Sequence, residues 1–195
     1  MRARAQAGVE AVGPLPRSTA WRNVLGCAFR TAGLLLRRQT HLRRELVGAR
    51  LRFADGTSSE VFRETTADVV DRDDPCLLFV TFRLRLLRGR WHKLFLWECI
   101  LNTPLFVGFP GFMSKLWLNV DEKDRYRGLY EWSDPQSAER YARSLWRVLD
   151  LVCAPGSIAY SIVPGLRRAE VLDDPTLLAP FDASGAAWWR VVTAL

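Results

Sequence analysis

The sequence predicts an α+β fold in which strands and helices alternate in the order β-α-β-β-α-β over residues 76–166. Three observations support this order. Residues 76–86 alternate apolar and mixed side chains, which is typical of a strand with one apolar face. A polar turn at 121–125 separates two further stretches of strand composition. Residues 134–152 then carry apolar side chains at helical spacing, behind an aspartate suited to an N-cap.

The remaining elements complete a split β-α-β arrangement, the ferredoxin-like fold, with both helices on one face of the sheet. Trp117 and other alternate strand residues make the opposite face too apolar to be exposed to water. We therefore expect a second copy of the chain to cover that face, which gives a dimeric α/β barrel and a homodimer. The expected elements are strands at 76–86, 112–119, 126–132 and 157–163 and helices at 90–102 and 134–152.

The rest of the chain is expected to flank this core. Apolar residues at helical spacing predict a helix from Trp21 to Val47. Alternation over residues 48–66, interrupted by Asp55-Gly56, predicts a β-hairpin. The apolar end of the chain is expected to dock on the core. The expected domains are a flexible tail at 1–20, a helix and β-hairpin appendage at 21–75, the ferredoxin-like core at 76–166 and a C-terminal extension at 167–195.

The charge of the chain comes from arginine. The net charge is +7, and only three of the 28 basic residues are lysines. Clustered basic residues with interleaved aromatics in a nucleic-acid-binding module are absent from the sequence, so we expect no nucleic-acid partner. Four arginines, Arg37, Arg38, Arg43 and Arg44, crowd the second half of the first predicted helix. We interpret them as a solvated face, and a membrane-surface contact by this basic helix is kept as the alternative.

The cysteine pattern predicts reduced thiols in a cytoplasmic protein. Cys27, Cys76, Cys99 and Cys153 form no CxxC pair, and the sequence holds only two histidines, so we expect no metal site. Residues 1–20 lack the continuous apolar run of a secretory signal. The most apolar stretch, residues 94–112, is interrupted by Glu98, Asn102, Pro104, Gly108 and Pro110, which argues against a transmembrane helix.

Four motifs point to a known family. Their residues are Pro110-Gly111-Phe112-Met113-Ser114-Lys115-Leu116-Trp117-Leu118, Arg127-Gly128-Leu129-Tyr130-Glu131-Trp132, Ser137-Ala138-Glu139-Arg140-Tyr141 and Pro155-Gly156-Ser157-Ile158. In sequence and order they resemble the YdhR-type mono-oxygenases of the dimeric α/β-barrel superfamily, relatives of the antibiotic-biosynthesis mono-oxygenases. The resemblance covers residues 76–166 and implies a homodimer that oxidises an aromatic or polyketide-type substrate without a cofactor. Other members of that superfamily are cyclases, isomerases, dehalogenating enzymes or haem proteins. The fold alone therefore does not determine the reaction.

A cleft is predicted on one face of the central hairpin. With residues 121–124 at the tip, Lys115 lies opposite Glu131 and Trp117 opposite Leu129, and paired residues share a face. A cation, a carboxylate and an aromatic wall are suitable parts for deprotonating a substrate and stabilising its anion. The structural alternative is an ordinary cross-strand ion pair.

Residues of the first core strand are expected to complete this cleft, whereas Leu116, Leu118 and Tyr130 are expected to pack on the helices. A register one residue different would instead bring Tyr130 and Trp132 into the cleft. The expected catalytic residues are Glu131, Lys115 and Arg83, and the expected substrate-binding residues are Trp117, Thr81, Tyr130 and Trp132.

The function expected from these observations is a small cofactor-independent mono-oxygenase-like enzyme. A redox-neutral cyclase or isomerase that uses the same pocket is the alternative within enzymes. A non-catalytic ligand-binding or scaffolding protein is the alternative outside them.

Overall fold

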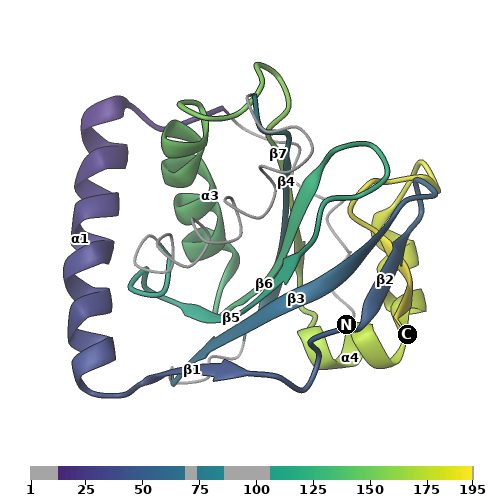
Figure 1. Cartoon of the computed structure of the whole chain (residues 1–195), viewed down its shortest axis with the longest axis horizontal. Helices are drawn as coiled ribbons and strands as arrows, with labels where there is room; N and C mark the ends of the chain where they lie inside the picture. The colour runs from purple at the N-terminus through teal and green to yellow at the C-terminus, as the bar shows by residue number, and fades with distance from the viewer. Residues whose placement is uncertain (1–12, 69–73, 86–105, 195) are drawn as a thin grey trace, which may run out of the picture.

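The structure, a computed structural model, describes residues 13–68, 74–85 and 106–194 and has the expected α+β class (Figure 1). A curled antiparallel sheet forms its centre, and helices lie on both sides of it. The helix predicted at 90–102 lies outside the described residues. The strands are β1 (Thr40–Arg43), β2 (Arg50–Phe53), β3 (Ser58–Ala67), β4 (Cys76–Phe82), β5 (Phe112–Leu118), β6 (Tyr126–Trp132), β7 (Ala159–Pro164) and β8 (Val191–Ala194). The helices are α1 (Arg17–Leu36), α3 (Pro135–Leu149), α4 (Arg168–Asp173) and the 3₁₀ helix η3 (Pro175–Phe181).

The strand order of the sheet is β7-β4-β6-β5-β3-β2-β8, with β1 paired to β3 beside this path. The four strands predicted for the core therefore occupy one half of the sheet. Counted among themselves, they have the order 4-1-3-2 and are antiparallel, which is the ferredoxin-like arrangement. This half of the fold is confirmed.

Helix α3 begins where its sequence signature places it. The Asp134 carboxylate accepts a hydrogen bond of 2.7 Å from the Ser137 amide, and Pro135 occupies the first helical turn. Its buried residues, Ala138, Tyr141 and Ala142 among them, face the sheet. Capping and amphipathic spacing agree here, so the helix is specified locally.

Helix α1 is shorter than predicted, and the predicted end at Val47 is wrong. The helix ends at Leu36, and Arg38 adopts a left-handed backbone conformation with φ of 55°. The chain then forms the short strand β1, which pairs with β3. Pairing with an existing strand edge thus outweighs the helical spacing of the residues beyond Leu36.

The predicted hairpin exists, but it is part of the main sheet. Strands β2 and β3 pair on either side of the Asp55-Gly56 turn, where Gly56 has φ of 83°. Strand β3 also pairs with β5, from Val61 opposite Leu118 to Thr66 opposite Ser114. The sheet therefore extends beyond the ferredoxin-like half into the N-terminal segment.

The sheet face opposite α1 and α3 is covered by the chain itself. Apolar residues of that face pack against residues of α4, η3, β2 and β8. Figure 1 shows α4 and β2 on the right of the molecule. The expected docking of the C-terminal extension is confirmed, since Val171, Leu178, Trp189 and Val191 are all buried there. The argument that a second copy must cover this face is therefore wrong. The homodimer itself remains a prediction.

A cluster of ion pairs joins two turns at one end of the sheet. Arg127 donates to Asp121 at 2.6 Å and to Asp55 at 3.1 Å, and Arg125 binds the same two carboxylates. Arg127 also donates to Thr57 at 2.8 Å, and its guanidinium lies over the Phe53 ring. These contacts connect the β2–β3 turn to the β5–β6 turn.

Two adjacent leucines of η3 test whether the extension is part of the core. Leu178 is fully buried on the sheet, whereas its neighbour Leu177 is partly exposed. We expect Leu178→Ala to lower the free energy of unfolding by about 2–5 kcal/mol, because it leaves a cavity. The matched variant Leu177→Ala should change it by roughly 0.5 kcal/mol or less. Chemical denaturation of both variants measures this, and equal small losses would mean that the extension is loosely attached.

The ion cluster should make part of the stability depend on acid. Burial raises the pKa of Asp55, but hydrogen bonds from Thr57 and Arg125 outweigh this effect and hold the pKa below its ordinary value of 3.8. A carboxyl group whose pKa is lowered by folding stabilises the fold at pH values above its ordinary pKa, and this stability is lost as the pH falls through the folded-state pKa. Asp55→Asn should therefore be less stable than the wild type near neutral pH, and the difference should shrink below about pH 4. A constant difference across a pH series of unfolding curves would contradict this account.

Candidate functional site

The side of the sheet that faces α1 and α3 (the helix-facing side) contains a buried lysine surrounded by aromatic rings. The ammonium of Lys115 lies 3.0 Å from the centre of the Trp117 ring, 4.5 Å from that of Phe106 and 4.7 Å from that of Tyr130. Trp117 in turn donates from Nε1 to the Thr65 hydroxyl at 3.2 Å. The negative faces of the rings favour a cation at this position.

Two tyrosines extend this polar interior toward α3. The Tyr141 hydroxyl donates to the Tyr130 hydroxyl at 3.1 Å, and both residues are buried. Burial, together with the neighbouring Tyr130, raises the pKa of Tyr141 well above its ordinary value, so this hydroxyl stays protonated at neutral pH. The Phe109 ring packs edge-on against Tyr141, with 5.2 Å between the ring centres.

The strand register differs by one residue from the expected one, so the predicted Lys115–Glu131 pairing is wrong. Lys115 lies opposite Tyr130, and Ser114 lies opposite Glu131. The additional residue lies before the turn, where the Asn119 amide donates to Glu60 of β3 rather than to β6. Lys115 and Glu131 consequently lie on opposite faces of the sheet.

The seven predicted site residues are divided between the two faces. Lys115, Trp117, Tyr130 and Trp132 lie on the helix-facing side and are buried in its core. On the other face, Glu131 accepts a hydrogen bond of 3.2 Å from Ser114, and Thr81 donates to the Tyr126 carbonyl. Arg83 is exposed. Leu116 and Leu118 also lie on that other face, not on the side of α1 and α3 as expected. Tyr130 does lie on the side of α1 and α3.

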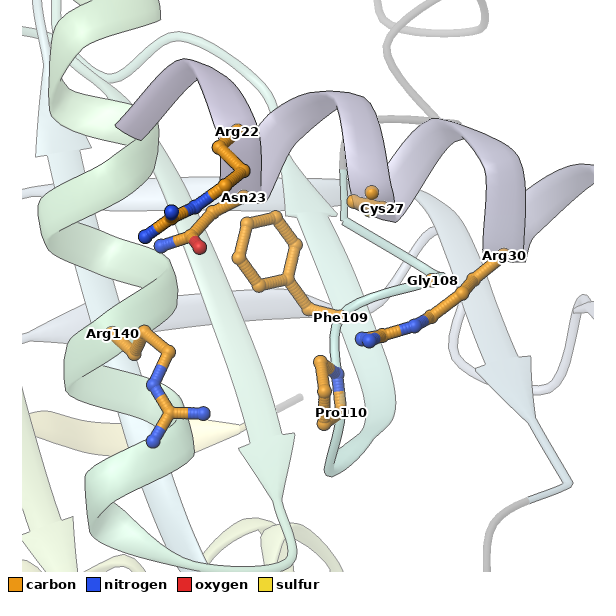
Figure 2. Close-up of a pocket in the computed structure, with 9 residues that line it drawn as sticks. Arg22, Asn23, Cys27, Arg30, Gly108, Phe109, Pro110 and Arg140 are labelled. Atoms are coloured by element: carbon orange, nitrogen blue, oxygen red, sulfur yellow. The ribbon is translucent and has the colours of Figure 1, made fainter. Parts of the chain in front are cut away.

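A cleft of about 300 Å³ lies between α1, α3 and the loop that precedes β5. Arg22 and Arg30 reach toward it from α1, and Arg140 reaches toward it from α3, around Phe109 and Pro110 (Figure 2). The lining residues are Arg22, Asn23, Gly26, Cys27, Arg30, Gly108, Phe109, Pro110 and Arg140. A second cavity of about 500 Å³ shares Arg30 and residues 108–110, so the cleft continues along α1. This second cavity is also lined by Arg37 and by the carboxylate of Asp68, which pairs with His41 at 3.0 Å.

The loop that lines the cleft approaches the backbone of α1 very closely at Gly108. A Cβ atom at this position would lie 2.2 Å from the Cys27 carbonyl oxygen and 2.7 Å from the Thr31 amide nitrogen. Only glycine fits such an approach. The loop is thereby held against α1, and Phe109 and Pro110 form the floor of the cleft between the two helices.

The cleft is electrostatically one-sided. Arg22, Arg30 and Arg140 form no ion pair with any residue of the described ranges, and none of the described lining residues carries a carboxylate. All three arginines are exposed to solvent. Guanidinium groups form bidentate hydrogen bonds with carboxylates and phosphates. The arrangement is suited to binding a small organic anion.

Cys27 does not add a reactive group to this cleft. Its thiol is buried, and burial raises its pKa to about 11 even though Thr31 and the backbone of Gly108 and Phe109 act in the opposite direction. A thiol in this state is neutral at physiological pH and a poor nucleophile. Cys27, Cys76 and Cys153 are buried and form no disulfide within the described residues, and Cys99 lies outside those residues.

The arginines of the cleft were not among the predicted site residues. The solvated face expected from the sequence consisted of Arg37, Arg38, Arg43 and Arg44, which lie beyond the last residue of α1, and no role was expected for Arg22, Arg30 or Arg140. One signal in the sequence does mark them. Arg22, Arg30 and Arg37 recur at about two helical turns in a helix without a single acidic residue.

In the described part of the chain, no helix is long and apolar enough to cross a membrane. Within the same residues, no group of three or more His, Cys, Asp or Glu side chains is arranged to hold a metal ion.

Comparisons with known proteins give distant structural neighbours. No protein-family model matches the chain, and no curated protein matches it. One similar solved structure is an uncharacterized ferredoxin-fold protein related to antibiotic biosynthesis monooxygenases from Listeria monocytogenes. It is 13% identical over 57% of this chain and 66% of its own, with a TM-score of 0.42. The chain therefore spans slightly less than two thirds of that neighbour's length.

The second similar structure is a major regulator of staphylococcal pathogenesis, 16% identical over 54% of this chain and 67% of its own, with a TM-score of 0.35. Both likenesses are too distant to bear on function. The fold and the site define an α+β protein with a ferredoxin-like half-sheet and an arginine-lined cleft.

Trp117 tests the observed register. In the structure it is buried between the sheet and the Phe106 ring, under the helix-facing side. Trp117→Ala should therefore lower the free energy of unfolding by about 3–5 kcal/mol. That loss corresponds to roughly 2–4 °C in Tm per kcal/mol for a chain of this size. The partly exposed Trp21 supplies the control, since Trp21→Ala should change stability little. An unchanged melting temperature for Trp117→Ala would favour the originally expected register.

Proposed function

We propose that the protein binds a small acidic aromatic or polyketide-type compound in the cleft between α1 and α3. The single observation that carries this proposal is the set of three guanidinium groups, Arg22, Arg30 and Arg140, around one opening that contains no described carboxylate. Unpaired arginines in a concave site are favourable partners for an anionic group.

The lining supports a ligand with both a charged and an apolar part. Arg22 and Arg30 from α1 and Arg140 from α3 would receive a carboxylate, enolate or phosphate from two sides. Phe109 and Pro110 would contact a flat apolar portion, and Asn23 would add an amide that can donate or accept. The second cavity along α1 offers space for an extended ligand.

The geometry of this cleft favours binding over acid–base catalysis. Apart from arginines, Cys27 is the titratable residue among the described lining groups, and its raised pKa keeps it neutral. Proton transfer at neutral pH needs a group that titrates near that pH. The cleft by itself therefore provides recognition of an anion and no evident base.

A mono-oxygenase-like activity is the second candidate. Its support is the motif resemblance together with the buried Lys115, which contacts Tyr130, which in turn hydrogen-bonds Tyr141. Tyr141 packs against Phe109, which is part of the cleft floor. A cofactor-independent oxygenase must deprotonate its substrate and stabilise the anion, and the cationic and hydroxyl groups would serve the second task. Oxygen uptake with a bound ligand separates this candidate from a redox-neutral cyclase or isomerase and from binding alone.

The binding proposal predicts charge selectivity. We expect 1-naphthoate to bind more tightly than the neutral 1-naphthalenemethanol, as measured by calorimetry at two salt concentrations. Arg140→Gln should weaken naphthoate binding by about 10- to 100-fold, because a charge-assisted hydrogen bond contributes about 1.5–3 kcal/mol. Arg52→Gln, an exposed arginine on β2 outside the cleft, should leave the affinity unchanged. Equal affinity for the two compounds, or equal losses in the two variants, would contradict the proposal.

A further inference from the structure

Helix α1 has two apolar faces, and only one of them is covered. Ala20, Val24, Cys27 and Thr31 face inward and are buried. On the outer side, Trp21, Leu25, Phe29 and Leu36 are 43, 59, 80 and 86% exposed. Figure 1 shows α1 at the edge of the molecule, with no other described element over its outer side.

The outer residues form a continuous stripe. At about 100° per residue, Trp21, Leu25, Phe29 and Leu36 fall within a sector of roughly 80°. Ala28, Ala32 and Leu35 widen this sector to about 120°. By contrast, the exposed residues of α3 are polar, for example Gln136 and Arg140. An exposed apolar stripe of this kind is typical of an interaction surface and not of a solvated helix.

The charge of α1 determines which partner is complementary to the stripe. Arg22, Arg30 and Arg37 lie along one flank and Arg17 lies at the start of the helix, all exposed, and residues 17–36 contain no acidic residue. A second copy of α1 on this stripe would bring arginines against arginines with no carboxylate of the helix to pair them. An anionic surface, by contrast, would complement them.

We propose that the outer face of α1 binds an anionic membrane surface. The helix lies in the interfacial plane, with the apolar stripe below the headgroups and the exposed arginines outside the 300 Å³ cleft, Arg17 and Arg37, on lipid phosphates. Trp21 is suited to the interface because its ring is apolar and its N–H is polar. A helix of 20 residues is about 30 Å long and contacts the surface along its length.

The test is co-sedimentation of the full chain with phosphatidylcholine vesicles, with and without phosphatidylserine. We expect binding that requires phosphatidylserine and weakens as salt is raised. Leu25→Glu/Phe29→Glu should weaken it at least about tenfold, because two apolar residues no longer enter the interface. The matched control, Leu177→Glu/Val192→Glu, introduces the same charge at two other partly exposed apolar positions and should bind as the wild type does. Arg17→Gln/Arg37→Gln should lose on the order of fivefold per arginine.

Three results would overturn the proposal. The first is the absence of phosphatidylserine-dependent binding by the wild type. The second is equal binding by the α1 double variant and its control, with thermal melts showing that both are folded. The third is a wild-type dimer, seen by light scattering without vesicles, that Leu25→Glu/Phe29→Glu dissociates, since a second copy would then be the partner of the stripe. Leu25→Glu/Phe29→Glu and its control keep every arginine of the 300 Å³ cleft and of the second cavity, so naphthoate binding by these two variants tests the proposed function separately.

Discussion

The pairing of β3 with β5 is the contact on which the rest of this structure depends. Strand β3 is the only described element that pairs with three others, because β1, β2 and β5 all use its edges. Through β2 it also connects β8 and the C-terminal extension to the sheet. The ion cluster around Arg127 then holds the turn before β3 against the turn before β6. Strand β3 thereby connects the ferredoxin-like half of the sheet to the segments that cover its second face, so that a single chain covers both faces.

The same arrangement explains why the surroundings of Lys115 and those of the cleft arginines differ. Lys115 projects from the helix-facing side of the sheet into the core, where aromatic rings replace water around its ammonium. The arginines of the cleft lie on α1 and α3, around a loop that contacts α1 closely at Gly108. Their charges remain in contact with solvent and available to a ligand. Lys115 is therefore part of the core, whereas the three arginines are at the surface.

The half of the fold that could be predicted from the sequence is the half with local signals. Asp134 and Pro135 mark a helix start, and Asp55-Gly56 marks a turn, because each residue has a direct conformational effect. The end of α1 and the partner of the second sheet face depend on pairings between distant segments, which no local pattern encodes. The register error has the same origin, since Asn119 bonds to β3 and not across the hairpin. Because the observed register differs by one residue, Glu131 lies on the face opposite Lys115. The expected catalytic residues therefore do not lie together. The cleft was missed because its arginines come from two helices that only tertiary packing brings together.

The pairing of β2 with β8 has a consequence for how the chain is made. Strand β2 is synthesised before every core strand, whereas β8 leaves the ribosome after all the other described strands. Until β8, α4 and η3 emerge, the apolar residues of one sheet face have no cover from the extension. Contacts so distant in sequence also close slowly, because the entropy of a long loop must be lost first. Before these elements emerge, the nascent chain consequently has an exposed apolar face, a state in which chaperone binding competes with aggregation.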